Sequence, residues 1–154
     1  MRYAAHVGLG VGCWGVYAAI VNSYAPETVI GVVDACLMLP VVAIASLLPD
    51  IDHPESKLGR RIKPISTILS LFSHRGITHS LWAVGLMVWL LASHQADSIA
   101  SQALVIGYLS HLLGDAVTPA GIRPFWPLGR AQRIGLNHAV VASVGIILFL
   151  RWMY

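Results

Sequence analysis

Charged residues are scarce in this sequence: Asp, Glu, Lys and Arg make up 11% of its 154 residues, and only seven residues are acidic. An ordinary soluble domain carries roughly 25% charged residues, so this scarcity excludes a conventional water-soluble fold. At the same time, 56% of the residues are hydrophobic. The composition therefore predicts an integral membrane protein.

Cysteines, internal repeats and a cleavable leader are also sparse or missing. Cys13 and Cys36 lie within apolar segments and lack C-x-x-C spacing, so we expect both to be reduced packing residues. No repeat, low-complexity tract or change of composition marks a boundary, which predicts a single domain over residues 1–154. The N-terminus lacks the basic region and cleavage site of a removable signal peptide, so we expect the first apolar segment to be retained.

Five segments are apolar enough to form membrane-spanning helices, which need roughly 17 to 25 residues. They cover approximately residues 4–22, 28–49, 77–93, 99–118 and 138–153. The sequence therefore predicts an all-α integral membrane protein, a compact bundle of about five transmembrane helices.

A further short helix is predicted within "GRRIKPISTILSLF", residues 59–72. Its apolar residues recur at helical spacing, Pro64 suits a first turn, and its basic end would meet anionic headgroups. We expect either an interfacial helix at the cytoplasmic membrane surface or a connecting helix packed on the bundle. In both cases it could form one wall of a site.

The loops between the apolar segments differ sharply in charge. Loop 50–76 holds five Lys or Arg residues, loop 119–137 holds three, and the turns near 23–27 and 94–98 hold none. By the positive-inside rule, the N-terminus and both long loops are cytoplasmic and the C-terminus is outside. We expect a multi-pass protein of a bacterial or archaeal inner membrane.

Histidines gather at one side of this predicted topology. A single histidine at a membrane helix end is usually an interfacial or capping residue, but a one-sided cluster indicates one shared site. Only His94 falls in an opposite turn, where we expect a solvated loop residue. The six histidines at the cytoplasmic side are His6, His53, His74, His79, His111 and His138.

Carboxylates accompany these histidines. The motif "SHLLGD" places His111 and Asp115 at i and i+4, on one helix face, as a helical pair of metal ligands requires. Asp50 and Asp52 lie in "LPDIDHPES", where the second proline disfavours helix. An extended or turn-like backbone there would let both carboxylates face the same way and bridge two metal ions. Because an aspartate in a membrane segment costs several kcal/mol, such residues survive mainly when paired or functional.

The blocks "LPDIDHPES", "SHRGITHS" and "YLSHLLGDAVTPAGIRPFWP" resemble the signature blocks of the YdjM-like family, predicted membrane-bound metal-dependent hydrolases of which some are controlled by LexA. The resemblance covers nearly the whole chain. It implies a distant similarity to zinc-dependent phospholipases C and P1-type nucleases. It also implies metal ligands at Asp50, Asp52, His53, His74, His79, His111 and Asp115, with His6 as an N-terminal contributor.

Mixed His and Asp donors suit zinc, with manganese or magnesium as alternatives, and one to three such ions would activate water and polarise a phosphoryl oxygen. We therefore expect a hydrolase that acts on a lipid phosphoester at the cytoplasmic membrane face, with membrane lipids as partners and no nucleic acid. The expected metal ligands are His6, Asp52, His53, His79, His111 and Asp115.

Several residues and function classes stay open. Asp50 and His74 could be ligands, could orient ligand histidines or could act as a general base, and Glu55 is a further base or an exposed loop acid. Arg75 could hold a phosphate bidentately or act as a positive anchor. The alternatives to a hydrolase are a metal-ion transporter, which usually needs polar groups spread through the membrane depth, and a membrane scaffold with a structural metal site.

Overall fold

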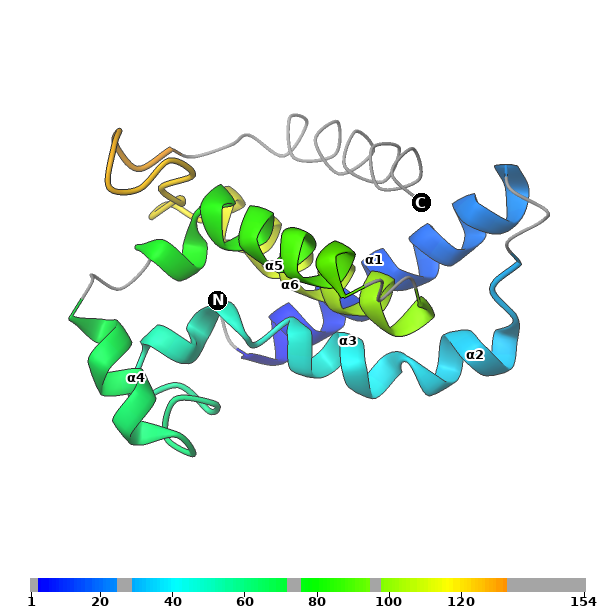
Figure 1. The fold of residues 1–154 in the computed structure, drawn as a ribbon, viewed down its shortest axis with the longest axis horizontal. Helices are drawn as coiled ribbons and strands as arrows, with labels where there is room; N and C mark the ends of the chain where they lie inside the picture. The colour runs from blue at the N-terminus through cyan, green and yellow to red at the C-terminus, as the bar shows by residue number, and fades with distance from the viewer. Residues whose placement is uncertain (1–2, 25–28, 72–75, 95–97, 133–154) are drawn as a thin grey trace.

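The structure is a computed structural model that describes residues 3–24, 29–71, 76–94 and 98–132 (Figure 1). Within these ranges there is no strand, and a single antiparallel bridge joins Ile122 and Gln132. The all-helical prediction is therefore confirmed for this part of the chain. The elements, in order, are α1 (Tyr3–Tyr24), α2 (Val32–Leu37), α3 (Leu39–Ala45), the 3-10 turn η2 (Pro49–Asp52), α4 (Lys63–Ser70), the 3-10 turn η3 (Ile77–His79), α5 (Leu81–Ser93) and α6 (Ile99–Val117).

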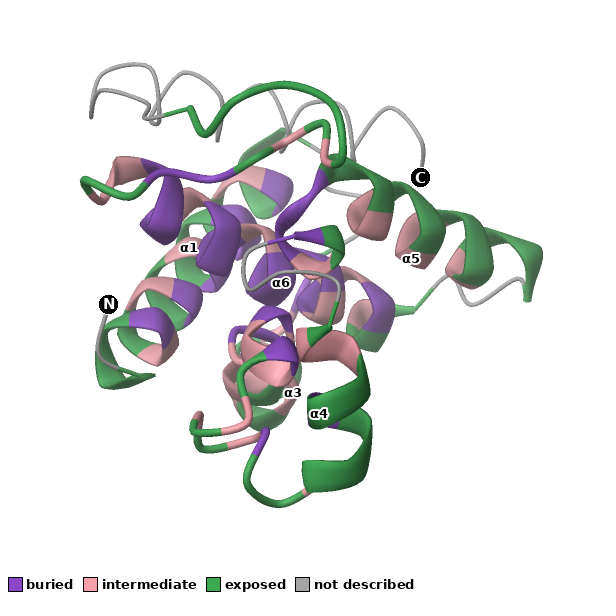
Figure 2. Ribbon diagram, turned by 90° about the vertical axis from the view of Figure 1, so that its left-hand side faces the viewer, coloured by how far each residue is buried: buried purple, intermediate pink, exposed green. Residues whose placement is uncertain are grey.

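Helix α6 is the central element of the fold. It packs against α1, α3 and α5 and is the most extensively buried helix of the described residues (Figure 2). Its start is fixed by Ser98, whose Oγ accepts a hydrogen bond from the Ser101 backbone N–H at 3.2 Å. It ends at Val117, two residues before Pro119, because proline disfavours helix in the residue that precedes it.

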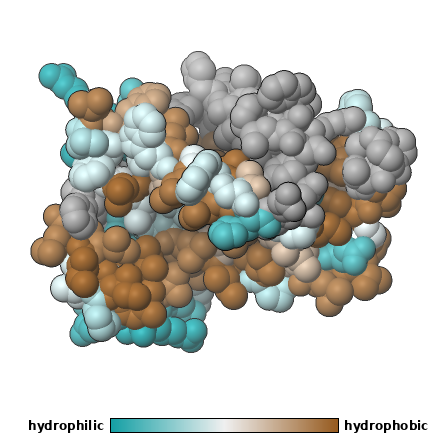
Figure 3. All heavy atoms as spheres, in the orientation of Figure 1, coloured by the Kyte–Doolittle hydropathy of each residue, from teal (hydrophilic) through white to brown (hydrophobic). Residues whose placement is uncertain are grey.

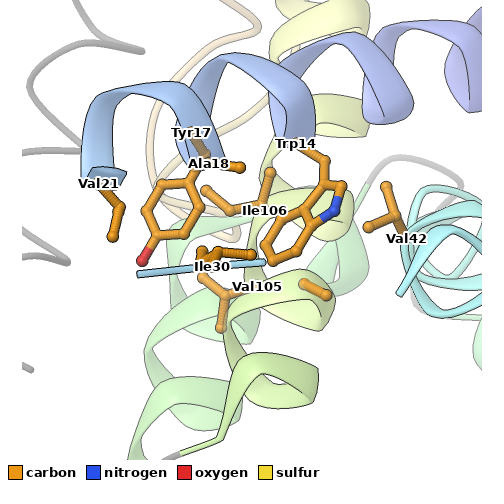
Figure 4. Close-up of a cluster of buried hydrophobic side chains, with 9 residues drawn as sticks. Trp14, Tyr17, Ala18, Val21, Ile30, Val42, Val105 and Ile106 are labelled. Carbon is orange, nitrogen blue, oxygen red and sulfur yellow. The ribbon is translucent and has the colours of Figure 1, made fainter. Parts of the chain in front are cut away.

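The hydrophobic core lies between α1, α3 and α6. Two hydrogen bonds link α1 to neighbouring helices: Trp14 Nε1 donates to the Ala35 carbonyl of α2 at 3.0 Å, and the Tyr17 hydroxyl donates to Gln102 Oε1 of α6 at 3.0 Å. Hydrogen bonds between helices of this kind stabilise their packing. The buried core side chains include Trp14, Tyr17, Val42, Val105 and Ile106 (Figure 4).

Two glycines allow α1, α3 and α6 to approach closely. A Cβ atom on Gly107 would lie 2.7 Å from both the Val42 carbonyl oxygen and the Ala45 Cβ atom. A Cβ atom on Gly10 would lie 3.1 Å from the Ser46 Cβ atom. Small residues at such crossings let helix backbones pack directly on each other.

Among the described residues, two stretches are long and apolar enough to cross a membrane, Tyr3–Tyr24 and Val32–Asp52. They correspond to the first two predicted spans. The third is shorter than predicted, because η3 precedes α5 and the 13 residues from Leu81 cover only about 20 Å of the roughly 30 Å hydrocarbon core. Helix α6 is not among the long apolar helices of the described residues, and the predicted span 138–153 lies outside them. A five-span bundle is therefore not established.

The short helix predicted within residues 59–72 is α4, with Pro64 in its first turn as expected. It packs against η2, at the edge of the molecule (Figure 1). Most of its residues are exposed, as the green ribbon of α4 shows (Figure 2). The helix thus lies beside the turn that carries Asp50 and Asp52.

Candidate metal centre

Histidine and aspartate side chains from four elements converge at one end of the helices. α1 contributes His6, η3 contributes His79, and the last two turns of α6 contribute His111 and Asp115. These four residues are at most 2% exposed. Asp50 of η2 completes the cluster and is 24% exposed.

The first group of potential ligands is formed by Asp50, His79 and His111, whose donor atoms lie within 4.8 Å of one another. His79 Nε2 and His111 Nε2 face each other at 3.2 Å. The Asp50 Oδ1 atom lies 3.6 Å from His111 Nε2 and 3.9 Å from His79 Nε2. Two ring nitrogens and a carboxylate oxygen therefore surround one point.

The second group is formed by His6, His111 and Asp115. The His6 ring stacks on the His111 ring, with centroids 3.8 Å apart, and His6 Nε2 lies 3.6 Å from Asp115 Oδ1. The other Asp115 oxygen, Oδ2, lies 3.5 Å from His79 Nε2 and 3.8 Å from His111 Nε2. The two groups share His111 and lie next to each other, so they form one cluster. Different subsets of its side chains could bind an ion.

The orientation of His111 is set by the backbone of the second apolar stretch. His111 Nδ1 lies 2.7 Å from the carbonyl oxygen of the buried residue Ser46. A carbonyl oxygen only accepts hydrogen bonds, so Nδ1 carries the ring proton and Nε2 presents its lone pair to the cluster.

Thr78 and Asp52 orient His79 so that its Nε2 atom, like that of His111, faces the cluster. The Thr78 hydroxyl donates to Asp52 Oδ2 at 2.6 Å, so its oxygen accepts from His79 Nδ1 at 3.1 Å. Asp52 Oδ2 is itself 3.6 Å from His79 Nδ1, and the Tyr108 hydroxyl donates to the Thr78 carbonyl. His79 Nε2 therefore also turns its lone pair toward the cluster.

The electrostatics of the cluster favour a bound cation. Two imidazole lone pairs that face each other at 3.2 Å repel unless a proton or a metal ion lies between them. The carboxylate oxygens of Asp115 and Asp52 lie 3.5 Å from His79 Nε2 and 3.6 Å from His79 Nδ1. These negative charges attract positive charge to the cluster.

The residues present fit a metal ion. At Zn–N distances of roughly 2.0–2.1 Å, two tetrahedral nitrogen ligands lie about 3.3 Å apart, close to the 3.2 Å observed between His79 and His111. His6 Nδ1 is buried and makes no hydrogen bond with any described residue. Buried donors of this kind are typical of a site that a ligand completes. The buried His and Asp groups could therefore hold a metal ion.

The structure places the side chains of Asp50 and Asp52 on different sides of the His79 ring. Residues 49–52 form a 3-10 turn, in which side chains two positions apart point in different directions. Asp50 accordingly lies on the Nε2 side of His79, and Asp52 lies on the Nδ1 side with Thr78. The two carboxylates therefore do not face the same way, and Asp52 belongs to neither potential ligand group.

The structure does not bring the remaining predicted site residues into either ligand group of the described residues. His53 ends η2 with an extended backbone, and it is exposed, as are Glu55 and His94. His53 belongs to neither ligand group of the described residues. His74 and Arg75 lie outside the described residues, as does His138.

Sequence reasoning missed three residues that shape the cluster. Thr78 could have been recognised from its position next to His79, because a hydroxyl there can reach the imidazole ring. Ser46 contacts His111 through its backbone carbonyl, and the Tyr108 hydroxyl donates to the backbone carbonyl of Thr78. Contacts with the backbone leave no pattern of side chains in the sequence, so neither residue could be identified from it.

Comparison with known proteins identifies the family. The sequence model of the family described as YdjM inner membrane protein matches residues 1–153. "Inner membrane protein YdjM" of Escherichia coli (strain K12) is 45% identical over 101 residues, which cover 58% of this chain and 49% of the relative. "Uncharacterized protein YvsG" of Bacillus subtilis (strain 168) is 39% identical over 95 residues, which cover 61% of this chain and 59% of the relative. The chain thus spans about half the length of the Escherichia coli relative. No solved structure matches this chain.

The family match includes every residue of both ligand groups. The two long apolar stretches agree with the membrane location that the family description gives. The chain is therefore a membrane protein and belongs to the YdjM family.

Proposed function

We propose that the chain is a membrane-embedded metal-dependent hydrolase that acts on a lipid phosphoester at the cytoplasmic membrane face. The observation that carries the proposal is the convergence of Asp50, His79 and His111 on one point, with His6 and Asp115 beside it. These residues would hold a divalent ion, zinc by the match of donors, with manganese or magnesium as alternatives. Such an ion supplies a Lewis acid that polarises a phosphoryl oxygen and makes bound water more acidic.

Asp50 gives the cluster its contact with solvent. It is 24% exposed, whereas the other four donors are at most 2% exposed. Water and a phosphate group would therefore approach from the side of η2. In this proposal the Asp50 carboxylate oxygen that does not bind the ion would take a proton from an attacking water, while the buried histidines keep their orientation through Nδ1.

Arg75 is the proposed phosphate-binding residue on the basis of sequence alone. It lies four positions before His79, and a guanidinium can hold two phosphate oxygens in a planar fork. Arg75→Lys keeps the charge and loses the fork. We expect this variant to lose most of its activity while it keeps its metal and its topology.

The test is release of phosphate or headgroup from a panel of phospholipids and polyprenyl phosphates by the purified full chain in liposomes. Release should require added divalent metal, stop with a chelator and be lost in His111→Ala. His94→Ala is the matched control, because His94 is exposed and lies outside both ligand groups. No release from any lipid by metal-loaded protein would overturn the proposal.

A structural metal site in a membrane scaffold is the second candidate, because four of the five donors are almost completely buried. Closed sites of this kind contribute folding energy rather than chemistry. The exposure of Asp50 favours the hydrolase over the scaffold. Under the scaffold alternative, chelation would unfold the protein and no lipid would be hydrolysed. Metal flux into liposomes would instead identify a transporter.

A further inference from the structure

Helix α4 turns large apolar side chains outward, unlike a helix packed on a protein core. Its one buried residue is a serine, Ser66. Two large apolar side chains of α4, Ile65 and Ile68, point outward and are 53% and 59% exposed, and Leu71, directly after the helix, is 79% exposed. Pro64, Ile68 and Leu71 follow the i, i+4, i+7 spacing of one helix face, opposite Ser66.

This orientation is fixed by tight packing on the inner side. A Cβ atom on Gly59 would lie 2.8 Å from Ser66 Oγ and 2.1 Å from the His53 carbonyl oxygen. The loop that follows η2 therefore passes directly under the serine face of α4. Because rotation of α4 would break this packing, the outward position of the apolar stripe, defined as Pro64, Ile65, Ile68 and Leu71, is a built feature of the fold.

The helix start is strongly basic. Arg60, Arg61 and Lys63 are exposed, and none of them forms an ion pair with another described residue. Helix α4 contains no acidic residue. Figure 3 shows apolar atoms over the lower left of the molecule, where α4 lies, with hydrophilic atoms along the lower edge. An apolar stripe beside unpaired cations is the pattern of a helix that lies in the surface of an anionic membrane.

We propose that α4 lies in the interface of an anionic lipid bilayer, with the stripe toward the acyl chains and Arg60, Arg61 and Lys63 at the phosphate groups. The chain is a membrane protein, and the charge of the helix start complements anionic headgroups. Since α4 packs on η2, it brings those headgroups to the exposed edge of Asp50. Only this last step rests on the proposed hydrolase; the contact between α4 and the bilayer does not.

The test is electron paramagnetic resonance of single spin labels on the full chain in liposomes. Both native cysteines, Cys13 and Cys36, are free thiols and are replaced by alanine to make the background. Labels at Ile68→Cys and Leu71→Cys are compared with a label at the exposed loop residue Glu55→Cys. Collisions with oxygen report the bilayer, and collisions with a water-soluble nickel chelate report water.

In phosphatidylglycerol liposomes, the ratio of oxygen to nickel collisions should be several-fold higher at positions 68 and 71 than at position 55. It should fall in phosphatidylcholine, and it should fall in phosphatidylglycerol when Arg60, Arg61 and Lys63 are all replaced by Gln. Nickel collisions equal to those at position 55 would place the stripe in water and overturn the proposal. Protection from both reagents would show a protein cover, such as a second copy, and equal ratios in both lipids would remove the requirement for anionic lipid. These results do not depend on hydrolysis, so they can fail while the proposed function holds.

Discussion

The ring orientations of His79 and His111 are determined by neighbours on the side away from the cluster. Ser46 holds His111 through a backbone carbonyl, and Thr78 holds His79 through its hydroxyl. Such outer contacts fix the tautomer of a metal ligand before the ion arrives. These two contacts would hold both histidines in the orientation that a bound cation requires.

Thr78→Val should weaken metal binding. The substitution keeps the shape of the side chain but removes the hydroxyl that links Asp52 to His79 Nδ1. Loss of an outer contact of this type typically lowers metal affinity by about 10- to 100-fold. Thr78→Ser keeps the hydroxyl and is the matched control. Competition titration with a chelating dye would measure both, and unchanged affinity in Thr78→Val would contradict the orienting role.

Asp50→Ala should reduce the bound metal, whereas His53→Ala should leave it unchanged. Asp50 Oδ1 belongs to a ligand group, and His53 is exposed and belongs to neither group of the described residues. Elemental analysis of the purified variants would compare them with the unmodified chain. A loss of metal in His53→Ala with full occupancy in Asp50→Ala would reverse the assignment.

The sequence could predict that histidine and aspartate side chains form the cluster. It could not predict which of these side chains face the shared point and which orient a neighbouring histidine. The i, i+4 spacing of His111 and Asp115 predicts their shared face, because helical periodicity is a local property. The separation of Asp50 from Asp52 depends on whether four residues form a strand or a 3-10 turn. That choice is made by packing against α4 and η3, which the local sequence does not contain.

At the scale of elements, the crossing of α3 and α6 positions the cluster. Gly107→Ala would place a Cβ atom 2.7 Å from the Val42 carbonyl oxygen, and backbone cannot move aside as a flexible side chain can. We expect a loss of stability of about 1–3 kcal/mol, typical of overpacking. His111 lies one turn further along α6, so metal binding should weaken as well.

Gly85→Ala is the matched control for this prediction. It makes the same change within α5, where a Cβ atom would meet nothing within 4 Å. Thermal unfolding in detergent, followed by circular dichroism, should show a lower midpoint for Gly107→Ala and no loss for Gly85→Ala. Equal midpoints would show that the crossing tolerates the added methyl group.

The helices themselves were predictable where apolar periodicity is long, as in α1 and α6. The start of the third apolar helix could not be predicted in this way. Residues Ile77–His79 form a 3-10 turn, and this turn positions His79 in the cluster. For α4, the sequence predicted a helix with apolar residues at helical spacing, but it did not predict which way those residues face. Their direction is decided by the fit of Ser66 over Gly59, a contact between α4 and the loop that precedes it.

At the scale of the whole molecule, the cluster joins the beginning of α1 to the end of α6. His6 lies in the first turn of α1 and Asp115 in the last turn of α6, yet their side chains are 3.6 Å apart. The positive-inside rule predicted that these ends share one side of the membrane. Their convergence agrees with this arrangement, and which side is cytoplasmic stays a prediction.

Reporter fusions test that prediction. Fusions after Leu58 or Gly129 should report the cytoplasm, because the loops around them carry the Lys and Arg residues. Fusions after Ala25 or Ala96 should report the outside. Leu58 and Gly129 on opposite sides of the membrane would contradict a single cytoplasmic site.

The central claim is that the cluster of His6, Asp50, His79, His111 and Asp115 binds a metal ion. Its most direct test is the metal content of the purified full chain, measured together with that of a His111→Ala/Asp115→Ala double variant and the His94→Ala control. The double variant removes one donor from the first ligand group and two from the second. We predict bound metal in the unmodified chain and in His94→Ala, and its loss in the double variant. Full metal occupancy in the double variant would contradict the claim. So would the absence of bound metal in the unmodified chain after incubation with excess divalent metal.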